Sequence, residues 1–189
     1  MLGRNARASI IERVDVGLHR HFQGAKGEER KVRFVYPNGD VQHFEGAKSE
    51  EHKVHVVYLN ENVQHIEGAK DEEHKVRLVN SNDGVEKHYE GAKGEERKVR
   101  AVFPDGVEKH FEGANGEEHK VRIVYPSGVV QHFEGVKGEE RQVRLELPNR
   151  GDWYYEGPKN EEHKVRWVST DGQVQYYEGP KGYEGMVNF

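Results

Sequence analysis

The chain has 189 residues, which is the length of one domain or of two small ones. Hydrophobic residues make up 33% of the chain and charged residues another 33%, a composition unusual for a globular enzyme. Lys and Arg number 29 against 34 Asp and Glu, and this net charge of −5 argues against nucleic acid as a partner, because such proteins need a basic face. The absence of cysteine excludes disulfides, thiolate chemistry and cysteine-ligated metal sites.

No stretch approaches the ~20 consecutive apolar residues of a membrane span, and the first residues lack the apolar core of a secretory signal. We therefore expect an intracellular, cytoplasmic protein. The aromatic residues and the 22 glycines indicate short strands joined by tight turns.

A repeated segment of about 22 residues accounts for most of the sequence. One glycine returns in the same context eight times, at Gly24, Gly46, Gly68, Gly91, Gly113, Gly135, Gly157 and Gly179. The intervals are 22 residues, except for one of 23 that has an extra residue in the turn at 80–84. We expect a single repeat domain of about eight units over residues 17–189, preceded by an N-terminal extension or cap over residues 1–16.

Each repeat is predicted to form two strands and two turns. Residues 31–36 are rich in β-branched and aromatic residues, as a strand requires. Pro37-Asn38-Gly39 then matches a three-residue hairpin loop, in which proline fixes the first φ and glycine takes the left-handed region. A second strand follows, and the polar residues 49–52 turn the chain back.

The hairpin loop also predicts the register of the two strands. It pairs Val35 with Val41, Phe34 with Gln42, Arg33 with His43, Val32 with Phe44, and Lys31 with Glu45. Equivalent turns are expected to centre on Gly39, Gly84, Gly106, Gly128 and Gly172. The turns at 60–62 and 149–151 lack the Pro-x-Gly order, so looser pairing is expected there.

Two strands and two turns in each repeat predict an all-β fold. We expect an elongated, antiparallel β-meander of hairpin repeats, built as a single layer that is curved or twisted. Glycine, proline and β-branched residues argue against helices, and a propeller blade would need about 40 residues.

The sequences Tyr89-Glu90-Gly91, Tyr155-Glu156-Gly157 and Tyr177-Glu178-Gly179 resemble the core of MORN repeats, and four other copies have Phe in place of Tyr. The resemblance covers residues 17–189. It departs from the family where Ala47-Lys48 replaces a frequent tryptophan and where Lys53-Val54 replaces a Gly-x-Gly pair. The resemblance implies β-hairpins stacked into a ribbon, and a role in scaffolding, self-association or attachment near membranes.

The predicted register places the Val32, Phe34 and Phe44 columns on one face. In the middle repeats Val99, Phe111, Val121 and Phe133 are expected to be the most buried. A single layer cannot hide a whole face, so this face is also the candidate interaction surface. Its candidate residues are Phe44, Tyr89, Phe111, Phe133, Tyr155, Tyr177, Val187 and Phe189.

The 12 histidines are interpreted as a structural ladder. Equivalent histidines in successive repeats should lie ~9.6 Å apart, too far to share a metal ion. The repeated glutamates, such as Glu45 and the pair Glu50-Glu51, are interpreted as cross-strand ion pairs and solvated turns, because eight equivalent copies do not make a catalytic pair. No motif for a catalytic site or a cofactor is present, so we expect no enzyme activity, no metal and no cofactor.

The leading hypothesis is a non-catalytic scaffold or protein-interaction module with a protein partner, or one that self-associates. The strand at Met186, Val187 and Phe189 is a candidate for self-association, because no proline or lysine protects its edge. The alternative is a peripheral membrane adaptor, in which basic columns such as Lys26, Lys48, Lys70 and Lys93 bind anionic lipid.

Overall fold

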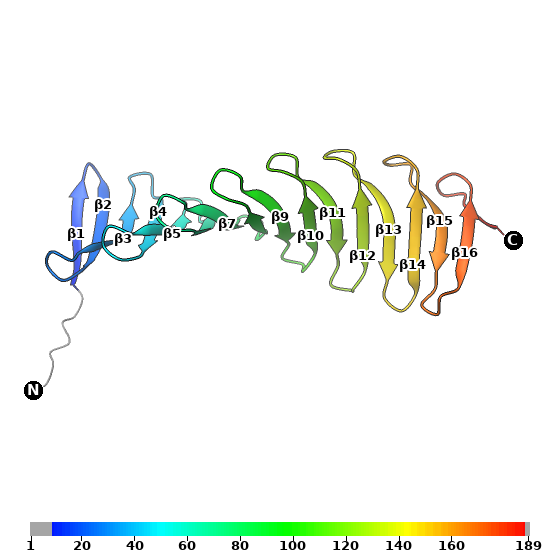
Figure 1. Cartoon of the computed structure of the whole chain (residues 1–189), viewed down its shortest axis with the longest axis horizontal. Coiled ribbons are helices and arrows are strands. Elements are labelled where there is room, and N and C mark those ends of the chain that lie inside the picture. Colours follow the sequence, from blue (N-terminus) through cyan, green and yellow to red (C-terminus); the bar gives the residue numbers. More distant parts are fainter. Residues whose placement is uncertain (1–8, 188–189) are drawn as a thin grey trace, which may run out of the picture. The chain divides into compact units, whose positions relative to one another are not determined.

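The computed structural model describes residues 9–187, and within this range it contains strands and no helix (Figure 1). The chain divides into two compact units, residues 1–96 and residues 97–189, which we call unit 1 and unit 2. The strands of unit 1 are β1 (Ser9–Asp15), β2 (Leu18–Gly24), β3 (Arg30–Val35), β4 (Val41–Glu45), β5 (His52–Val57), β6 (Val63–Glu67), β7 (His74–Val79) and β8 (Glu86–Glu90). Those of unit 2 are β9 (Arg97–Val102), β10 (Glu108–Glu112), β11 (His119–Val124), β12 (Val130–Glu134), β13 (Arg141–Leu147), β14 (Gly151–Glu156), β15 (His163–Val168), β16 (Val174–Glu178) and β17 (Gly185–Val187).

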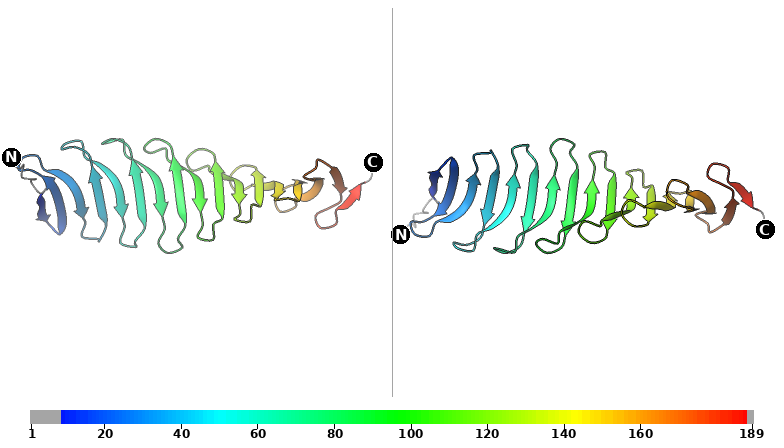
Figure 2. Two further views of the ribbon diagram at one scale, coloured as in Figure 1. Left: turned by 90° about the horizontal axis from the view of Figure 1, so that it is seen from below. Right: turned by 90° about the horizontal axis from the view of Figure 1, so that it is seen from above.

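Each unit is an antiparallel meander in which every strand pairs with the next one in sequence. The pairing runs from β1 to β8 in unit 1, which Figure 2 shows. It runs from β9 to β17 in unit 2, and Figure 1 shows this succession as far as β16. The predicted all-β meander of hairpins is confirmed. The described residues include no helix with the length and hydrophobicity that a membrane span requires.

Part of the predicted N-terminal extension belongs to the sheet of unit 1. Residues 9–15 form β1 and pair with β2 along their whole length, from Ser9 with Gly24 to Asp15 with Leu18. A two-residue turn of Val16 and Gly17, both at positive φ, joins the two strands. Residues 1–8 lie outside the described residues, and so do residues 188–189.

The predicted hairpin loops are confirmed. The N–H of Tyr36 donates to the carbonyl of Asp40, and the N–H of Gly39 donates back to Tyr36, each over 2.9 Å. Gly106, Gly128 and Gly172 close equivalent turns, and Gly84 closes the longer one. The turn at 60–62 was expected to pair more loosely. It keeps the same three strand pairs, because Glu61 adopts the left-handed φ of 64° that glycine has elsewhere. The hairpin at 149–151 pairs four residues on each strand.

The register is correct near the loop and wrong beyond it. Arg33 pairs with His43, Phe34 with Gln42 and Val35 with Val41, as predicted, but the hairpin ladder stops there. Beyond that point Phe44 pairs with Lys53 and Glu45 with His52, both on the next repeat. The predicted ion pair between Lys31 and Glu45 is therefore absent from the ladder.

A β-bulge at the equivalent valine of six repeats explains the difference. Between β10 and β11, His110 pairs with Arg122 and Phe111 pairs with Lys120, so Val121 has no partner in the register. An extra residue on one strand reverses the alternation of side chains. Val121 therefore shares a face with Arg122, and Lys120 moves to the face of Phe111. The bulge recurs between repeats in both units.

The bulge also changes which side chains are most buried. Val99, Phe111, Val121 and Phe133, which were expected to lead, are only half-buried. The buried apolar residues are Val56, Ile66, Val85, Ala101 and Ile123. Three of them, Val56, Ala101 and Ile123, belong to the column of Phe34. Because each unit is one layer, none of the described side chains is fully enclosed.

This assignment predicts that Ile123→Asp is far more damaging than Val121→Asp. Ile123 is 8% exposed, so a carboxylate there loses most of its water. Its cross-strand neighbour Lys109 would offset only part of this loss, so the change should cost several kcal/mol. At Val121 the new carboxylate would lie on the same face as Arg122 and beside its guanidinium. This change should cost less than about 1 kcal/mol. Urea unfolding of the two variants measures the difference. If Val121→Asp were the more destabilising change, the assigned faces would be reversed.

Candidate functional site

The two faces of the sheets differ in composition. The register places the histidines of each unit on one face, which we call the histidine face. Most aromatic side chains lie on the opposite face, which we call the aromatic face. The histidine face carries His19, His21, His43, His52, His55, His65, His74 and His88 in unit 1, and His110, His119, His132 and His163 in unit 2.

Most of the predicted interaction residues lie on the aromatic face, half-buried and covered by lysines. The described members are Phe44, Tyr89, Phe111, Phe133, Tyr155 and Tyr177. The ammonium groups of Lys75, Lys98 and Lys120 lie 3.6–3.7 Å from the centres of the Tyr89, Phe111 and Phe133 rings. Lysine stems and charges therefore shield this face from apolar contact.

The remaining two candidate residues do not join this cluster. Val187 pairs with Tyr176, whereas Tyr177 pairs with Met186, so Val187 and Tyr177 lie on opposite faces. Phe189 lies outside the described residues. Near Val187, the exposed apolar side chains are Val174, Tyr176, Tyr183 and Met186.

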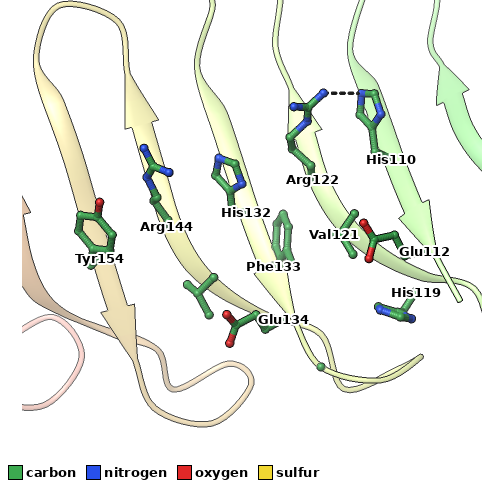
Figure 3. Close-up of a pocket in the computed structure, with 12 residues that line it drawn as sticks. His110, Glu112, His119, Val121, Arg122, His132, Phe133, Glu134, Arg144 and Tyr154 are labelled. Carbon is green, nitrogen blue, oxygen red and sulfur yellow. Dashed lines mark hydrogen bonds between the residues drawn. The ribbon is translucent and has the colours of Figure 1, made fainter.

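The histidine face of unit 2 is hollowed into a groove of 810 Å³ over strands β10 to β14 (Figure 3). A row of side chains crosses it from strand to strand, in the order His110, Arg122, His132, Arg144 and Tyr154. Glu112 and Glu134 line the groove nearer the strand ends. A second hollow of 450 Å³ continues the groove to Arg166 and Tyr176. Tyr154 lines both hollows, so the two form one continuous surface.

The arginines of these strands differ in whether the hairpin supplies an acid beside them. Where the partner strand offers an acid, the arginine is paired: Arg100 with Glu108 at 2.5 Å, and Arg144 with Asp152 at 2.7 Å. Val130 and Val174 stand at the equivalent hairpin positions, two residues before the direct partners of Arg122 and Arg166. Among the described residues, no carboxylate lies within ion-pair distance of Arg122 or Arg166. We call these two residues the open arginines.

The open arginines are held in place by neutral groups. The Nη2 atom of Arg122 lies 3.4 Å from Nε2 of His110, as the dashed line in Figure 3 marks. Burial and the positive charge of Arg122 lower the pKa of His110, so its ring is neutral at pH 7 and can accept this hydrogen bond. The guanidinium of Arg166 lies 3.9 Å from the centre of the Tyr154 ring. Both guanidiniums are oriented without being neutralised.

The second glutamate of each Glu-Glu pair has a role that the sequence interpretation missed. Glu51 is buried, and its carboxylate accepts the N–H of Lys31 at 2.9 Å and that of Ser49 at 3.0 Å. Lys31 belongs to the preceding repeat, so the carboxylate joins two repeats. We call the set the bridging glutamates: Glu51, Glu73, Glu96, Glu118, Glu140, Glu162 and Glu184. They replace the predicted solvated turns with backbone contacts.

Three of the four lysines of the lipid hypothesis, Lys48, Lys70 and Lys93, make a second connection between repeats. The ammonium of Lys48 donates to the carbonyl of Gly27 at 2.5 Å, and that of Lys70 donates to Ser49 at 2.8 Å. Lys93, Lys137, Lys159 and Lys181 repeat the contact. These lysines are thus engaged with the neighbouring loop, although they remain at the surface.

The histidine ladder is closer-packed than expected in unit 1. His55 stands where other repeats have arginine, so His43, His55 and His65 occupy adjacent strands. The rings of His43 and His55 stack with their centres 4.1 Å apart. Stacked rings do not direct their nitrogens to one point, and the described residues contain no group of three or more ligands arranged for a metal ion.

The sequence matches no protein-family model, and comparison with curated proteins gives no match. Among solved structures, the chain is similar to the TCP domain of SAS-4 (dCPAP) of Drosophila melanogaster, determined in complex with a proline-rich motif of Ana2 (dSTIL). The alignment covers 95% of this chain and 97% of that one, with 13% identity and a TM-score of 0.45. A likeness this weak carries no argument about function.

Proposed function

We propose that the protein is a non-catalytic interaction module that binds a protein partner in the groove on the histidine face of unit 2. The observation that carries the proposal is the pair of open arginines in a continuous hollow lined by Tyr154 and Tyr176. Arginine and tyrosine are enriched where proteins bind one another. A cytoplasmic location and a divergent MORN-like origin of the repeats belong to this proposal.

The repeated chemistry supports a binding role over an enzymatic one. Catalysis requires neighbouring groups in different environments, whereas here equivalent residues recur in each repeat. The acids and bases of the groove are mostly paired with each other, as Glu134 is with Arg141 at 3.3 Å and His132 with Glu146 at 2.8 Å. The groups that can engage a ligand are the two open arginines and the tyrosines that line the groove.

Site-specific crosslinking tests the proposal. A photoreactive amino acid replaces Tyr154 in the groove or, as the matched control, its neighbour Trp153, which faces the other way. We expect crosslinks to a discrete protein in cells of the source organism from position 154 and not from position 153. Equal crosslinking from both positions would contradict a partner in the groove.

The membrane adaptor remains the competing proposal. Three of its four lysines already donate to carbonyl groups of the neighbouring loops, which leaves them less free to bind phosphate. Flotation with vesicles rich in phosphatidylserine distinguishes the two, because lipid binding through surface charge is lost as salt is raised. Salt-sensitive flotation together with no crosslinking from position 154 would favour the membrane adaptor.

A further inference from the structure

The spacing of the open arginines indicates what kind of chain fits the groove. Arg122 lies on β11 and Arg166 on β15, four strands apart in the meander. At ~4.8 Å between neighbouring strands, the two guanidiniums are separated by roughly 19 Å. A fully extended chain advances ~3.3 Å per residue, so about six residues cover this distance.

Between the open arginines the groove is lined by aromatic and apolar side chains together with charged groups that already have partners. Val143 and Tyr154 line both hollows, and the guanidinium of Arg144 is already neutralised by Glu146 at 3.1 Å and Asp152 at 2.7 Å. The carboxylates of Glu112 and Glu134 lie toward the strand ends, and the register sets them opposite His119 and Arg141. Positive charge without a partner is therefore concentrated at two separate points rather than spread along the face.

We propose that the groove binds an extended acidic peptide segment whose carboxylates, about six residues apart, engage Arg122 and Arg166. This inference rests on the proposed function and specifies its partner. Each guanidinium can form a bidentate contact with a carboxylate, which is a strong and directional charge-assisted interaction. The segment between the two acidic points lies across Tyr154 and Val143. A single acidic residue would engage only one anchor and bind weakly.

Three fluorescein-labelled peptides of equal length test the spacing by fluorescence anisotropy with the full chain. The first has two Glu-Glu pairs six residues apart, separated by glycine and serine, and the second has the four glutamates together. The third has glutamine in place of each glutamate. We expect the first peptide to bind about tenfold more tightly than the second, because only it reaches both anchors, and the third not to bind. Equal affinity for the first two peptides would overturn the proposal.

Variants then locate the contact. Arg122→Gln and Arg166→Gln should each weaken binding of the first peptide about tenfold, which removes its advantage over the second. Val130→Glu keeps Arg122 but supplies a cross-hairpin acid like Glu108, and should weaken binding similarly. Arg33→Gln is the matched control, since Arg33 has Val41 at the equivalent hairpin position but lies in unit 1, and it should leave affinity unchanged. If Arg33→Gln weakened binding as much as Arg122→Gln did, general charge would explain the result and the proposal would fail.

The same titration with phosphatidylserine vesicles distinguishes a lipid ligand. Vesicle binding that depends on Arg122 and Arg166, without binding of the first peptide, would overturn the acidic peptide as the occupant. The crosslinking experiment at position 154 is independent of these probes. Crosslinks to a protein together with no peptide binding would mean that the groove binds a partner of different chemistry, so failure of this inference is distinguishable from failure of the proposed function.

Discussion

Gly135→Ala is expected to destabilise unit 2 by about 3 kcal/mol or more. Gly135 has a φ of 116°, and a Cβ atom there would lie 2.5 Å from the carbonyl oxygen of Glu139. That oxygen belongs to the backbone of the same tight loop and cannot rotate away. The unfavourable φ and the steric clash therefore act together, and the loop that connects two repeats would have to open. The seven other glycines of this column have φ values of 106–144° and meet the same obstacle.

Gly138→Ala is the matched control for this change. Gly138 also has a positive φ, of 84°, but a Cβ atom there would have no atom within 4 Å. Ser49, Asp71 and Asn160 already occupy equivalent positions with φ of 68–73°. The control should therefore cost only about 1 kcal/mol. Urea unfolding monitored by circular dichroism measures both variants. If both variants lost the same free energy of unfolding, the steric clash would not be the reason for glycine at position 135.

Glu118→Gln is expected to cost about 1–3 kcal/mol, although the two side chains have nearly the same shape. The carboxylate of Glu118 accepts the N–H of Lys98 and that of Gly116, each at 3.1 Å. An amide keeps only one acceptor oxygen, so its NH₂ group would face a backbone N–H donor. Glu117→Gln is the matched control, since its side chain is exposed, and it should leave the free energy of unfolding within about 0.5 kcal/mol of wild type.

The same contact predicts a pH dependence of stability. The Lys98 N–H lowers the pKa of Glu118; burial opposes this effect, and the net pKa is lowered. A carboxylate with a lower pKa in the folded state stabilises that state above the ordinary glutamate pKa of about 4.3, and the contribution is lost as the pH falls through the folded value. We expect stability to fall steeply below about pH 4.3, and less steeply in Glu118→Gln. Parallel pH profiles for the two proteins would contradict the bridging role.

Much of the fold could be predicted because local sequence determines it. Pro37-Asn38-Gly39 fixes a loop geometry, and the loop fixes the register of the next three pairs without reference to distant residues. The bulge at Val121 could not be predicted in this way, because it depends on how one repeat pairs with the next. That single unpaired residue moved Val121 to the histidine face and Lys120 to the aromatic face, and with them the predicted core.

The bridging glutamates and the open arginines did leave a signal in the sequence. Within the Glu-Glu pair, the first position becomes Tyr183 in the last unit, whereas the second is glutamate in every unit. If both side chains of the pair were simply solvated, glutamate would not be kept at the second position more strictly than at the first. The hairpin position near each arginine likewise differs between repeats, because some have an acid there, as in Glu108, and others have valine, as in Val130. The roles of these residues could not be predicted from the sequence, because they depend on which residue of a neighbouring strand or loop each one contacts.

The positions of the open arginines along the groove are set by which repeats have valine, and not an acid, at the hairpin position. Arg122 and Arg166 occupy the same position two repeats apart, so the distance between them comes in whole repeats of about two strands, ~9.6 Å. Duplication of one repeat between them would increase the distance between the two open arginines by one repeat, because the bridging contacts join only adjacent repeats. Replacement of valine by an acid at one hairpin would pair the arginine of that repeat and leave the other open arginines unchanged. The length of the recognised segment and the positions of its charges can therefore evolve separately.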